Sequence, residues 1–194
     1  MPAPRMVRSG IEAMGTSSKE LAGKLRKLAQ RQHGCFTAAQ AIETGYADSV
    51  HLYHVRTGKW TRVYRGVYRL ADQPASPASR CMAALLWTRN KSGTIQGVLA
   101  ADTAEALQNE SLAEHDPIHV LVPKTFRRSS PTPKRIKIQK TDKKLHITLN
   151  IFGIPSQISQ SNQTGFQNLI KNAQDRPDYY DLIDYYMVIY DSPE

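Results

Sequence analysis

Two short helix patterns followed directly by a hairpin pattern constrain the fold of this chain more than any other feature. Thr37 is a candidate N-cap for a helix that Gly45 ends, and Asp48 or Ser49 can cap a further helix reaching Thr57. The short turn at Gly45 fits the joint of a helix-turn-helix. Residues 37–57 therefore predict a pair of helices in that arrangement.

A helix upstream of this pair completes a three-helix unit. Ser17 and Ser18 offer an N-cap, and Leu21, Leu25 and Leu28 follow at helical spacing. We expect this helix to end by Gly34.

Residues 60–70 predict the hairpin. β-branched and aromatic residues lie on both sides of Arg65-Gly66, where glycine readily adopts the positive φ of a tight turn. Arg62, Arg65 and Arg69 would then lie on a wing, where they can contact phosphates. Together, residues 17–72 predict a winged helix-turn-helix domain.

The third helix would present an outward face. If residues 48–59 are helical, Leu52 and Val55 can face the core. The side chains left outward or at the flanks, which can reach base edges and phosphates, are Ser49, Tyr53, His54, Arg56 and Thr57. Such units also serve as protein-docking modules, and this alternative stays open.

The uneven charge favours a polyanionic partner. The net charge of +9 divides into 12 Lys and Arg against 5 Asp and Glu in residues 1–75, 10 against 5 in residues 76–140, and 4 against 7 in residues 141–194. Positive charge on the helix-turn-helix half would attract nucleic acid in a salt-dependent manner.

Composition indicates a cytoplasmic globular protein without cofactor or metal. Cys35 and Cys81 lie in separate segments, no signal peptide is recognisable, and no CxxC or HxxxH spacing occurs. No apolar run approaches the ~20 residues of a membrane helix.

A second domain is expected over residues 78–190, after a proline-containing linker at residues 72–77. Its predicted elements are helices at 78–89 and 101–107 and strands at 94–99, 118–123, 135–140 and 145–152. The fold class is thus α+β, with the winged helix-turn-helix followed by a mixed α/β C-terminal domain.

Two further segments allow alternative interpretations. The basic loop at residues 124–135 is either a second phosphate contact or a solvated loop. The acidic, tyrosine-rich residues 178–190 form either a terminal element on their own domain or a partner surface.

Catalysis is not expected. Asp102, Glu105 and Glu110 lie near one another, but no ExK sequence accompanies them as metal nucleases require, and no G-x-S-x-G elbow exists. Asp102 and Glu105 fit better as residues of a helix's first turn.

Several runs of the chain match a known family pattern: residues 34–41, Gly45, residues 62–70 (RVYRGVYRL), residues 97–107 and residues 118–123. Together these runs resemble the AbiEi-type antitoxins of bacterial type IV toxin–antitoxin, or abortive infection, systems. The resemblance covers roughly residues 20 to 140.

The resemblance implies a repressor of its own operon that binds double-stranded promoter DNA and counteracts a co-encoded nucleotidyltransferase toxin without a stable complex. DNA contacts would fall on the third helix and wing, at Ser49, Tyr53, His54, Arg56, Arg62 and Arg65, and more weakly at Lys59 and Arg69. After residues 153–155 the chain departs from the family's pattern, which leaves the antitoxic role of the C-terminal part open.

Overall fold

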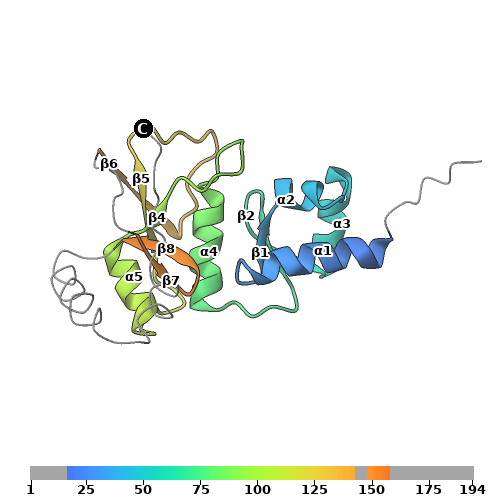
Figure 1. The fold of residues 1–194 in the computed structure, drawn as a ribbon, viewed down its shortest axis with the longest axis horizontal. Helices are drawn as coiled ribbons and strands as arrows, with labels where there is room; N and C mark the ends of the chain where they lie inside the picture. Colours follow the sequence, from blue (N-terminus) through green and yellow to red (C-terminus); the bar gives the residue numbers. More distant parts are fainter. Residues whose placement is uncertain (1–16, 143–147, 158–194) are drawn as a thin grey trace, which may run out of the picture.

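The computed structural model describes residues 17–142 and 148–157. Within them the fold is α+β: a helical N-terminal unit with a small sheet, then a five-stranded sheet with two helices (Figure 1). Helix α4 (Pro77–Trp87) lies between the two sheets. No helix among the described residues is long and apolar enough to span a membrane.

The N-terminal unit contains the predicted three helices and hairpin. Its elements are α1 (Ser18–Gln30), β1 (Cys35–Thr37), α2 (Ala38–Glu43), η1 (Asp48–Val50), α3 (His51–Arg56), β2 (Trp60–Tyr64) and β3 (Val67–Leu70). The Ser17 hydroxyl caps α1 by accepting a hydrogen bond from the Glu20 amide. Thr37 and Gln40 form a reciprocal capping box at the start of α2.

Aromatic packing holds the helices on one face of the antiparallel sheet β1-β3-β2. Trp60 lies edge-on to Phe36 with ring centroids 4.9 Å apart, and Tyr68 stacks on Phe36 at 5.9 Å. Leu25 of α1 and Leu70 belong to the same core. Because these residues are spread from α1 to β3, the hairpin is fixed relative to the helices.

The opposite face of this sheet packs against α4. Ser76 caps α4, and the Cys35 thiol of β1 donates a hydrogen bond to the Ser79 carbonyl at 3.3 Å. Burial raises the pKa of the Cys35 thiol to about 12, so the thiol stays protonated and can donate. Cys35 and Val67 therefore share a core with α4 and the large sheet.

The second sheet has the order β6-β5-β4-β8-β7 and mixes parallel with antiparallel pairs. Its elements, in chain order, are β4 (Val98–Leu99), α5 (Ala101–Gln108), β5 (Ile118–Pro123), β6 (Ile136–Thr141), β7 (Thr148–Ile151) and β8 (Ile154–Gln157). The predicted helices and the strand at residues 118–123 are confirmed. The strand expected at residues 94–99 is reduced to two residues, and β8 was not predicted.

The expected domain limits, 17–72 and 78–190, stay a prediction. Residues 158–190 of the second range, including the tyrosine-rich segment, lie outside the described residues.

Candidate nucleic-acid interface

The third helix differs from the expected one at its start. It begins as the 3-10 turn η1, and neither Asp48 nor Ser49 makes a side-chain cap. His51, not Leu52, is buried: its side chain lies against Trp60 and Tyr68, and its Nδ1 is 3.4 Å from the Asp48 carboxylate. The prediction that Leu52 faces the core is therefore wrong, whereas Val55 does pack against it.

The outward face of this helix combines polar and apolar side chains. Ser49, Leu52, Tyr53 and Arg56 are all exposed, and their i, i+3, i+4, i+7 spacing places them on one face. Leu52 is 55% exposed and Tyr53 58% exposed. Sequence reasoning missed Leu52, because an apolar residue at helical spacing ordinarily indicates the core.

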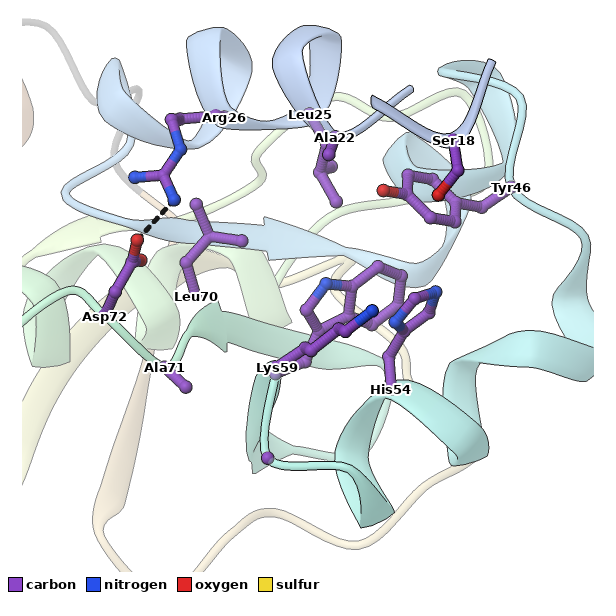
Figure 2. A pocket seen from close by; sticks show the side chains of 12 residues that line it. Ser18, Ala22, Leu25, Arg26, Tyr46, His54, Lys59, Leu70, Ala71 and Asp72 are labelled. Carbon is purple, nitrogen blue, oxygen red and sulfur yellow. Dashed lines mark hydrogen bonds and ion pairs between the residues drawn. The ribbon is translucent and has the colours of Figure 1, made fainter. Parts of the chain in front are cut away.

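His54 does not belong to that outward face. Its ring stacks on Trp60 with centroids 4.5 Å apart and meets Tyr46 edge-on at 5.3 Å. The three side chains and Lys59 line a hollow of about 320 Å³ between α1 and the start of β2. Figure 2 shows His54, Tyr46 and Lys59 around it. Burial, then the nearby Lys59 charge and His51, lowers the pKa of His54. The expectation that His54 points outward is thus wrong.

Two arginines of the hairpin are exposed, one on the sheet face that carries the helices and one at the hairpin tip. Arg62 is exposed on β2, two residues after Trp60, and pairs in register with Tyr68, so it lies on the sheet face that carries the helices. Arg65 is exposed in the two-residue turn, which Gly66 closes with a φ of +75°.

Arg69 lies on the other face. It alternates with Tyr68 and Leu70 on β3 and pairs in register with Cys35 of β1. Its positive charge partly offsets the rise that burial causes in the pKa of the Cys35 thiol. The Arg69 side chain is itself half-buried. The structure therefore separates Arg69 from Arg62 and Arg65.

Four cations of the third helix, the turn after it and the hairpin have no hydrogen-bond or ion-pair partner among the described residues. Within residues 17–142 and 148–157 no hydrogen bond or ion pair involves the side chains of Arg56, Lys59, Arg62 or Arg65. All four are exposed. Such uncompensated charges attract a polyanion.

The chain segment that carries this surface also matches a family model. Residues 24–71 match the family model of the AbiEi antitoxin transcriptional regulators. The resemblance found in the sequence is confirmed over this AbiEi segment, which contains all the candidate contact residues. It ends at residue 71, so the resemblance of residues 97–123 stays a prediction. No curated protein matches the chain.

Outside the AbiEi segment, the basic loop at residues 124–135 uses its arginines internally. Arg127 donates to the carbonyls of Lys124 and Phe126, and Arg128 donates to the Arg89 carbonyl while lying 4.7 Å from the Trp87 ring centroid. The loop guanidinium groups are thus structural contacts.

The carboxylates considered for metal chemistry do not converge. Asp102 lies in the first turn of α5, as expected, and pairs with His119 at 2.5 Å. Among residues 17–142 and 148–157 no group of three or more His, Cys, Asp or Glu could hold a metal ion. The sequence did not reveal the Asp102–His119 pair, because the two residues come together only when α5 packs against β5.

Proposed function

We propose that residues 17–72 are a winged helix-turn-helix that binds double-stranded DNA. The outward face of the third helix, Ser49, Leu52, Tyr53 and Arg56, lies in the major groove, and the β2–β3 hairpin is the wing. Arg62 and Arg65 contact phosphates beside the groove, and Lys59 adds a charge near the end of the helix. The observation that carries this proposal is the exposed face of the third helix together with the exposed cations of residues 56–65, which have no hydrogen-bond or ion-pair partner among the described residues.

Within this proposal the remaining two candidate residues have structural roles. His54 holds the third helix on Trp60, and Arg69 lies at the contact with α4. Neither makes a base contact in our account.

We further propose that the protein is an autoregulating antitoxin. It represses its own promoter and counteracts a co-encoded nucleotidyltransferase toxin in the cytoplasm without a stable antitoxin–toxin complex. The match of residues 24–71 to antitoxin transcriptional regulators supports this role.

One observation favours a second candidate function. Ile42, Leu52 and Tyr53 are large apolar side chains at least 48% exposed, and all three belong to the helix-turn-helix. Exposed apolar groups of this kind also mark protein-docking surfaces. In that case the unit would bind a protein and no specific DNA.

A gel-shift experiment distinguishes the two. The purified protein is titrated onto the DNA upstream of its own gene, with scrambled competitor and a salt series. A shift that survives the competitor and weakens steeply with salt supports the DNA-binding function. No shift, or a shift that any DNA abolishes equally, supports protein docking.

The antitoxin role needs its own measurement. Co-expression with the adjacent nucleotidyltransferase should restore growth, and affinity purification of either protein should not recover the other. Growth arrest that persists despite co-expression would contradict the role.

A further inference from the structure

Leu52 is a large apolar side chain that the fold leaves exposed. It is 55% exposed and belongs to neither hydrophobic core of the described residues. The core-facing stripe of its helix is formed by His51, which is buried, and by Val55 one turn further on, which is partly buried. Leu52 is therefore available to a partner of the helix.

The surroundings of Leu52 indicate which partner. On the same helix face lie the Ser49 hydroxyl and the Arg56 guanidinium, which has no hydrogen-bond or ion-pair partner among the described residues. Arg62 and Arg65 of the hairpin, which follows this helix in the chain, likewise have no such partner among the described residues. A helix face that places a leucine beside such a guanidinium, followed by a basic hairpin, is complementary to a DNA groove more than to an apolar protein surface.

We propose that Leu52 determines base specificity by packing against the C5-methyl group of thymine. This inference rests on the proposed DNA-binding function. A leucine side chain cannot donate or accept a hydrogen bond, so at a base edge it can gain only from apolar contact. The thymine methyl group is the apolar group that the major groove presents, and the minor groove presents none.

Tyr53 and Ile42 do not substitute for Leu52. Tyr53 carries a hydroxyl that can hydrogen-bond, and its ring lies 5.5 Å from that of His54. Ile42 has similar exposure but lies on α2, the helix that precedes the turn. Ile42→Ala is therefore a matched control for the loss of an exposed apolar side chain.

The test compares thymine with uracil, which differ only by that methyl group. Duplexes selected by the full-length wild-type protein from a randomised pool are resynthesised with deoxyuridine at one thymine position at a time. We expect the wild-type affinity to fall about fourfold for each contacted methyl group. Leu52→Ala should bind the thymine and uracil duplexes equally, whereas Ile42→Ala should keep the wild-type discrimination.

Two results would overturn the inference while leaving DNA binding intact: equal wild-type affinity for thymine and uracil duplexes at every position, or full discrimination by Leu52→Ala. If the wild-type protein selects no sequence at all, the proposed function itself fails, and the specificity role of Leu52 fails with it. A melting temperature for each variant shows that the folded state is retained.

Discussion

The third helix with its hairpin and the loop at residues 124–135 are both rich in basic residues, yet they use positive charge differently. In the loop, Arg127 and Arg128 donate to backbone carbonyls, and Arg128 also covers the Trp87 ring. On the hairpin, Arg62 and Arg65 have no hydrogen-bond or ion-pair partner among the described residues.

This difference separates charge that stabilises the fold from charge available to a ligand. A guanidinium already bonded to carbonyls would have to break those bonds before it could bind phosphate, whereas a free one loses only hydration and side-chain entropy. The net charge alone does not separate these two kinds of arginine, because each arginine adds one positive charge whether or not its guanidinium is already hydrogen-bonded.

The largest expected effect is on DNA affinity, from the double substitution Arg62→Ala with Arg65→Ala. We expect affinity to fall between about 10-fold and 100-fold, and the slope of log affinity against log salt to decrease by about 2, because two phosphate contacts are lost. Fluorescence anisotropy over a salt series measures both quantities. Unchanged affinity and slope would assign the free cations to another partner.

Arg128→Ala is the converse change. Loss of its hydrogen bonds to the Arg89 carbonyl and the Ser130 hydroxyl, and of its contact with Trp87, should lower the free energy of unfolding by about 1–2 kcal/mol, with DNA affinity unchanged. Urea denaturation measures the first quantity. Lys134→Ala is the control, because Lys134 is an exposed cation of the same loop. An Arg128→Ala protein with wild-type stability and weakened DNA binding would make the loop a second phosphate contact.

His54 should make stability depend on pH in a small but defined way. Its pKa in the folded protein lies below the ordinary value of 6.5, so the unfolded chain takes up the proton first as pH falls. The free energy of unfolding should therefore decrease below pH 6.5 and level off below the folded pKa. His54→Phe retains an aromatic ring on Trp60 and should remove this part of the dependence in urea titrations. An unaltered pH profile would place the titration elsewhere.

The smallest effect is expected at Arg69. Arg69→Gln should change DNA affinity by less than about twofold, because Arg69 lies on the α4 side of the hairpin sheet, away from Arg62. The same anisotropy assay measures it. A loss comparable to that of the Arg62 and Arg65 variant would show that the two faces of the hairpin act together.

Local signals in the sequence were sufficient for much of the N-terminal unit. Thr37 at the start of α2, and Gly66 in the hairpin turn, act through neighbours a few residues away, so their roles could be predicted. The face of the third helix could not, because burial of His51 depends on Trp60 and Tyr68 of the hairpin. The apolar pattern alone therefore predicted, wrongly, that Leu52 faces the core.

The large sheet shows the same limit. Strand β5 was recognisable from its own apolar run, but the parallel pairing of β4 with β8 joins Leu99 to Ser156 across most of the second half of the described chain. The short β8 contains Pro155 and carries no strong strand signal. Such pairings depend on the whole sheet and are not encoded locally.

The most direct test of the account is an NMR titration of the ¹⁵N-labelled protein with a duplex that it binds. We predict that the amide shift changes concentrate at residues 48–57 and 61–66, with residues 124–135 unaffected. Changes centred on residues 124–135, or none at the third helix and hairpin at saturating DNA, would contradict the assignment of the DNA-binding surface.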